Sequence, residues 1–164
     1  MELMNRIRER VVAWQKKRVR TVVFPLAGKL CAVETVEGKR LGQWQADYDG
    51  DTLNLKECFL SLKAAGLRGK NLWLLVNADS LRWSRKRYPQ MTEEEFAESM
   101  EWEADRVFHT EEAIAMGHRV LSHDEEGWEA LLHALPRVDL GAWEMGAHEA
   151  GLAITRAFPV TDIP

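Results

Sequence analysis

Residues 82–108 read RWSRKRYPQMTEEEFAESMEWEADRVF and hold the sharpest segregation of charge in the chain. A short, alternating basic run ends at Pro89, which predicts a strand. Thr92 then begins a helix in which Glu95 is placed to close a capping box. Nine acidic residues and one basic residue lie between Thr92 and Glu112. A charge run of this kind is typical of a solvated helix face, and it does not indicate an active site.

Two residues interrupt the pattern of this helix. On a 3.6-residue period, one face is apolar and should pack inward, formed by Phe96, Met100 and Val107. Glu103 falls on this apolar face, so we expect it to be ion-paired with Arg85 or Arg87 of the basic strand. Trp102 falls among the acidic residues, which indicates a side chain displayed for a partner or for the neighbouring subdomain. The alternative stays open, with Glu103 partly exposed and Trp102 packed within its own domain.

Composition limits the class of protein. The 164 residues are 46% hydrophobic and 29% charged, which is enough to bury a core in one or two small subdomains. The net charge of -4 argues against nucleic acid as a partner. Cys31 and Cys58 lack the spacing of a metal site and read as buried, reduced thiols. No apolar run approaches the ~20 residues of a membrane span. We expect a cytoplasmic protein without catalytic, cofactor-binding or metal-binding residues.

Residues 1–20 differ in charge from the rest of the chain. Seven Lys or Arg residues against two Glu residues give this segment +5 and leave -9 for the remainder. Four apolar residues recur at helical spacing and predict a basic amphipathic helix: Leu3, Ile7, Val11 and Trp14. Three interpretations stay open, namely docking on its own domain, attachment to an anionic membrane, or binding to an acidic partner helix. The candidate contact residues are Arg6, Arg10, Trp14 and Lys17.

The remaining pattern predicts a mixed α/β fold in two halves. Residues 21–48 form three short β-rich runs separated by turn signals, a helix ends at Gly66, and residues 71–78 are an apolar strand. The first half therefore reads βββαβ. In the second half, two further strands follow the acidic helix, and then come a helix over about 137–149 and a last strand over 152–160. That half reads βαββαβ.

Part of this sequence resembles a known family. The segment KNLWLLVNADSLRWSRKRYPQMTEEEFAESMEWEADRVF resembles the region of PilM-type actin-like proteins of type IV pilus assembly in which a strand leads into an acidic helix ending in Trp-Glu-Ala. The later GHRVL strand and the helix closing on Glu-Ala-Gly-Leu are also similar to that family. The resemblance implies half of an actin-like fold, with residues 21–79 as the first subdomain and residues 80–164 as an inserted βαββαβ subdomain.

The chain departs from the family at its phosphate-binding hairpin. Family members carry an Asp, a glycine turn and a downstream Lys there, whereas this chain reads VVFPLAGKLCAVE. Phe24 and Pro25 stand where the acid is expected, and Cys31 lies near the expected Lys. We therefore expect no ATPase activity.

Two function classes follow from these patterns. The resemblance implies a non-catalytic scaffold of type IV pilus, competence or type II secretion machinery, held at the inner membrane by a PilN-type partner or by its own basic helix. The alternative is a small nucleotide-binding protein or hydrolase with a degenerate actin-like site.

Overall fold

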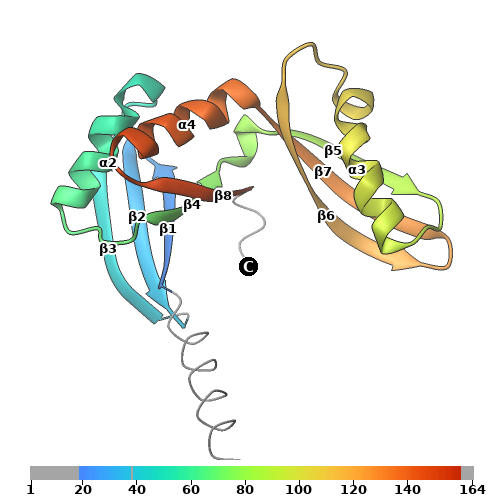
Figure 1. Ribbon diagram of the computed structural model, residues 1–164, viewed down its shortest axis with the longest axis horizontal. Coiled ribbons are helices and arrows are strands. Elements are labelled where there is room, and N and C mark those ends of the chain that lie inside the picture. Colours follow the sequence, from blue (N-terminus) through green and yellow to red (C-terminus); the bar gives the residue numbers. More distant parts are fainter. Residues whose placement is uncertain (1–18, 38, 160–164) are drawn as a thin grey trace, which may run out of the picture. The chain divides into compact units, whose positions relative to one another are not determined.

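The computed structural model describes residues 19–37 and 39–159 (Figure 1). The chain divides into two compact units. Within the described residues, unit 1 contains the residues up to Val76 and those from Ala142 onward, and unit 2 contains Asn77–Gly141. Each unit has its own sheet. No helix in these described ranges is long and apolar enough to cross a membrane.

Unit 1 is built on a five-stranded sheet in the order β3-β2-β1-β4-β8. Its strands are β1 (Val19–Leu26), β2 (Lys29–Val36), β3 (Lys39–Asp47), β4 (Asn71–Val76) and β8 (Ala153–Pro159). The first three form an antiparallel meander, as the sequence predicts, while β4 runs parallel to both β1 and β8. The β1–β2 turn places Ala27 and Gly28 at φ 48° and 76°. Two positive φ values in a two-residue loop match the right-handed twist of a hairpin.

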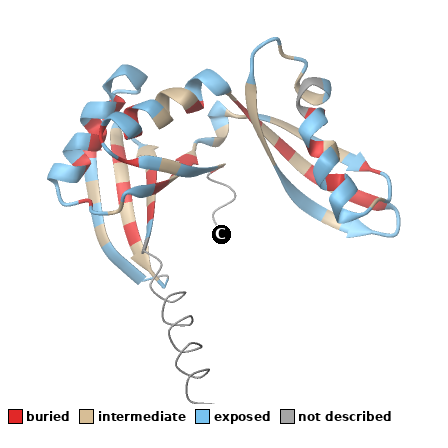
Figure 2. Cartoon of the chain, viewed as in Figure 1, coloured by how far each residue is buried: buried red, intermediate tan, exposed pale blue. Residues whose placement is uncertain are grey.

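Two helices pack on one face of this sheet, α2 (Leu55–Ala64) and α4 (Arg137–Glu149) (Figure 1). A short 3-10 turn, η1 (Thr52–Asn54), precedes α2. Phe59 of α2 is fully buried, and the Trp143 ring of α4 lies 6.3 Å from it and 5.5 Å from the Tyr48 ring. The core of the unit therefore lies between these helices and the sheet, and it includes the buried side chains of the central strands (Figure 2).

Unit 2 is a three-stranded antiparallel sheet in the order β5-β7-β6, with one helix on it. After the 3-10 turn η2 (Ala78–Ser80), its elements are β5 (Arg82–Tyr88), α3 (Glu93–Phe108), β6 (Ile114–Asp124) and β7 (Gly127–Pro136). The types and order of these elements agree with the sequence prediction. The buried cluster under α3 is Tyr88, Phe96, Met100, Trp128, Ala130 and Leu132.

The structure divides the chain differently from the predicted boundary after residue 79. The sequence pattern assigned the last helix and strand to a βαββαβ subdomain, but β8 joins unit 1 and pairs with β4 from Asn71↔Ala153 to Val76↔Pro159. The physical reason is that β4 is nearly continuously apolar and needs a neighbour on each edge, and chain order does not decide which strand supplies it. Unit 2 is therefore βαββ. The predicted N-terminal helix lies outside the described residues.

Candidate partner-binding surface

Helix α3 begins as its sequence predicts. The Thr92 side chain accepts a hydrogen bond from the Glu95 backbone N–H at 3.2 Å, and the Glu95 carboxylate accepts one from the Thr92 backbone N–H at 2.8 Å. The bonds to Thr92 lower the pKa of Glu95. The reciprocal bonds satisfy two backbone donors of the first turn and define where the helix starts. At its other end, His109 ends the helix in the left-handed conformation at φ 44°.

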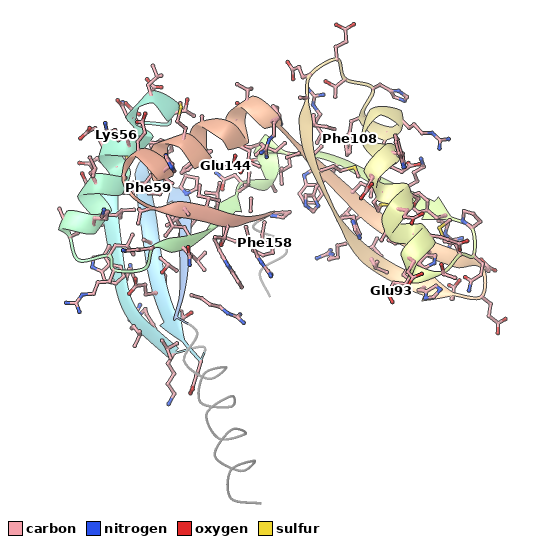
Figure 3. All side chains as sticks on the ribbon, in the orientation of Figure 1. Lys56, Phe59, Glu93, Phe108, Glu144 and Phe158 are labelled. Carbon is pink, nitrogen blue, oxygen red and sulfur yellow. The ribbon has the colours of Figure 1, made fainter. Side chains whose placement is uncertain are left out.

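The inner face of α3 is held by aromatic contacts. The Phe96 ring stacks on the Trp128 ring with centroids 4.6 Å apart, and it meets the Tyr88 ring edge-on at 5.4 Å. The Trp128 indole also donates a hydrogen bond to the Met91 carbonyl at 2.9 Å. These contacts attach the helix to β5 and β7, so its outer face is set rigidly relative to the sheet. Figure 3 shows Phe108 at the far end of this helix from Glu93.

Glu103 lies in this buried layer, as its helical phase predicts. Only 5% of the residue is exposed. Its carboxylate is paired with the Lys86 ammonium, and it accepts a hydrogen bond from the Tyr88 hydroxyl at 3.4 Å. Arg106, one turn further along α3, lies 3.5 Å from the other carboxylate oxygen. Burial and the Glu103 carboxylate together raise the pKa of Tyr88, which therefore stays protonated and able to donate.

The predicted partner of Glu103 is wrong. Arg85 and Arg87 point to the face of the sheet opposite α3, where both approach Glu129 of β7. Arg85 makes a two-pronged contact with Glu129, with both N–O distances 2.9 Å. Successive residues of a strand point to opposite faces of the sheet. Tyr88 packs in the buried cluster beneath α3, so Lys86, two residues earlier, points to the face that α3 covers, and the two arginines point to the other face.

Trp102 is displayed on the outside of α3. It is 76% exposed, which agrees with the prediction that it points away from the core. The exposed residues around it on the outer face are mainly acidic: Glu94, Glu98 and Glu101. The inner face of α3 is anchored to the sheet, so the exposed Trp102 indole on its outer face is suited to contact with another protein chain. Binding at Trp102 stays a prediction. The other candidate contact residues, Arg6, Arg10, Trp14 and Lys17, lie outside the described residues.

The β1–β2 hairpin does not present the groups of a phosphate-binding loop. Phe24 and Pro25 close β1, and Leu26 at the turn is 60% exposed. Lys29, the first residue of β2, is paired with Asp47 of β3, which lowers the pKa of Asp47. A cation held by a carboxylate does not offer its full charge to a phosphate group.

Beside this hairpin lies an open depression of about 540 Å³. Its lining includes three carboxylates, contributed by Asp47, Asp49 and Glu57, against one cation, Lys29. Asp49 accepts bonds from the Asp51 backbone N–H and the Asn54 amide. Burial raises the pKa of Cys58, which also lines the depression, so this thiol is protonated and unreactive. An acidic lining of this kind repels a polyphosphate. Among the described residues, no group of three or more His, Cys, Asp or Glu could hold a metal ion.

The sequence pattern did not single out one buried acid, Glu34. Glu34 of β2 is 6% exposed, and its carboxylate accepts hydrogen bonds from the Thr21 hydroxyl and from the backbone N–H groups of Arg68 and Gly69. It ties the loop after α2 to the sheet, which is a structural role. The signal was available, because Glu34 continues the alternation of Leu30 and Ala32 on the buried face.

Comparisons with known proteins agree with this architecture. No family model matches the chain, and no curated protein matches it. Among solved structures, the chain is similar to the PilM-PilN type IV pilus biogenesis complex, with a TM-score of 0.65 and 16% identity, covering 88% of this chain and 46% of that chain. It is also similar to the cytoplasmic domain of EpsL, an inner membrane component of the type II secretion system of Vibrio cholerae. That match has a TM-score of 0.56 and 15% identity, and it covers 87% of this chain and 57% of that one.

The chain thus spans about half the length of the solved structures that it matches. At these sequence identities, the similarity concerns the fold. The chain has a mixed α/β fold with two sheets that resembles part of an actin-like fold.

Proposed function

We propose that this protein is a non-catalytic adaptor of type IV pilus, competence or type II secretion machinery that binds an inner-membrane partner from the cytoplasmic side. The observation that carries the proposal is the similarity of nearly the whole chain both to a pilus biogenesis complex and to the cytoplasmic domain of a secretion component. A PilN-type protein is the partner class that the first of these matches suggests. Exposed Trp102 on α3 is the contact that we assign to the partner.

A pull-down from the source cell with the full chain tests the adaptor role. We expect a pilus or secretion component to be recovered, and recovery to fall when Trp102 is changed to Ala. Because Trp102 is 76% exposed, Trp102→Ala should leave the melting midpoint nearly unchanged. The matched control is Leu53→Ala, since Leu53 is 85% exposed in unit 1. Equal recovery with both variants would remove Trp102 from the interface, and a large drop in the midpoint with intact binding would return it to the core.

Titration with Mg-ATP separates the adaptor from the alternative of a nucleotide-binding protein or hydrolase. The Lys29 ammonium is paired with Asp47, and the neighbouring depression is acidic, so we expect no productive binding. A dissociation constant tighter than about 100 µM, or roughly -5.5 kcal/mol, would overturn this interpretation of the hairpin. The measurement is isothermal titration calorimetry with the full chain.

A further inference from the structure

The sheet of unit 1 has helices on one face only. Buried residues alternate along β2 with half-buried ones, so Leu30 and Ala32 lie under the helices while Cys31 and Val33 point to the other face. Cross-strand pairing continues this second face over four strands. One row is Val33, Val22, Trp73 and Arg156, and beside it lie two further pairs, Cys31 with Phe24 and Leu75 with Phe158. No described helix of unit 1 covers this face (Figure 1).

Over these four strands the uncovered face is mostly apolar, whereas the edge strand β3 adds Gln43 and Gln45, which pair with Val33 and Cys31. The Trp73 and Phe158 rings lie 5.4 Å apart, and Figure 3 shows Phe158 near the end of β8. Arg20 and Arg156 both stack on the Trp73 ring, with their guanidinium carbons 4.9 and 5.3 Å from its centroid. Because β4 has parallel neighbours on both edges, both of its faces are expected to be covered. A continuous apolar face of this kind indicates a surface that something packs on.

The chain itself carries a segment of the right length and pattern directly before β1. Residues 1–18 carry an apolar seam at helical spacing, formed by Leu3, Ile7, Val11 and Trp14. As a helix this seam would be about 17 Å long, and the four strands that carry the apolar face span about 14 Å. Residues 15–18 can reach about 13 Å when extended, which exceeds the ~10 Å between packed layers.

We propose that residues 1–18 pack through this seam on the uncovered face of unit 1 in the same chain. The covalent link to β1 supports this occupant, because a short tether gives a segment an effective concentration in the millimolar range, above that of a free partner or a second copy. In the packed position Trp14 belongs to the core of unit 1, while basic residues beside the seam, such as Arg6 and Lys17, stay available to an anionic partner. The inference does not depend on the proposed adaptor function.

Cys31 is a reporter placed on the uncovered face, and the only other cysteine, Cys58, is 5% exposed. The experiment measures the rate of thiol labelling in the full chain without lipid or partner, in a Cys58→Ala background. Ile7→Asp places a charge in the seam and should speed labelling of Cys31 on the order of tenfold, the effect of losing about 1.4 kcal/mol of docking. Ala13→Asp is the matched control, since Ala13 lies off the seam, and it should leave the rate unchanged.

Three results would overturn the inference. Equal labelling of the parent chain and Ile7→Asp would show that the segment does not cover this face. A parent rate that rises on dilution, together with a dimer by light scattering, would assign the segment to a second copy. If Ile7→Asp fails to fold, oxidation of Leu3→Cys, Ile7→Cys and Val11→Cys, each in the same background, decides, because packing through the seam requires at least one of them to form an intrachain disulfide with Cys31 that Ala13→Cys forms much less. Absence of that disulfide from all three would also refute the packing.

Discussion

The pairing of Glu103 with Lys86 is testable by a double-mutant cycle that combines Glu103→Ala with Lys86→Met. Methionine keeps the apolar stem of the lysine and removes its ammonium, so the cycle isolates the charged contact. We expect Glu103→Ala to lower the stability of unit 2 by about 2–3 kcal/mol, and the two changes to be coupled by about 2 kcal/mol.

The magnitude follows from the surroundings of the carboxylate. A hydrogen bond between charged groups contributes about 1.5–3 kcal/mol, and Lys86 supplies one. The Tyr88 bond at 3.4 Å is long and adds about 0.5 kcal/mol. Arg106 has a side chain that is 75% exposed and adds less than about 0.5 kcal/mol. The Lys86 side chain is 35% exposed and can be partly hydrated after the loss, which keeps the total below the ~3–5 kcal/mol of a fully buried pair.

The assay must report on unit 2 alone, because the chain divides into two units. The Trp128 indole N–H donates to the Met91 carbonyl inside unit 2, so its NMR signal in a urea titration follows unfolding of that unit. Arg85→Ala is the control, since Arg85 is paired with Glu129 on the opposite face and should show no coupling to Glu103. A coupling below about 0.5 kcal/mol with Lys86, or a larger one with Arg85, would refute the assigned pairing.

Three further predictions concern single contacts. Glu95→Gln should keep the cap of α3 but reduce the loss of stability in acid. The pKa of Glu95 is lowered in the folded chain, so its stabilisation is present above the usual pKa of 4.5 and is lost as the pH falls through the lower folded pKa. Urea titrations from pH 5 to about pH 3 measure this loss, and equal acid sensitivity in the parent and the variant would contradict the prediction. Gly69→Ala should destabilise unit 1 by about 1–3 kcal/mol, since the new Cβ would lie 1.9 Å from the buried Thr21 hydroxyl; a thermal midpoint equal to that of the parent would count against it. Phe96→Ala should cost unit 2 about 3–5 kcal/mol through the cavity it leaves, measured by the same urea titration, and a loss under 1 kcal/mol would mean that α3 does not depend on the aromatic stack.

Local sequence determined the elements of this protein and their order. The capping box at Thr92, the two-residue turn at Ala27 and Gly28, and the helix over residues 137–149 depend on residues close together in the chain. The side-chain period also placed Glu103 in the core and Trp102 outside it. These features follow from backbone geometry that a few neighbouring residues specify, so they could be predicted without knowledge of the rest of the fold.

The tertiary structure decided the partners. Alternation along β5 put Lys86 on one face of the strand and Arg85 and Arg87 on the other. Each face also carries one aromatic residue, Tyr88 on the first and Trp83 on the second, so the sequence did not specify which face meets α3. The place of β8 beside β4 was likewise undetermined, because pairing across some 80 residues depends on which edge is free once the sheet has formed. The sequence alone thus sets what each segment becomes, whereas long-range packing decides which segments meet, since a partner's face and edge exist only in the folded chain.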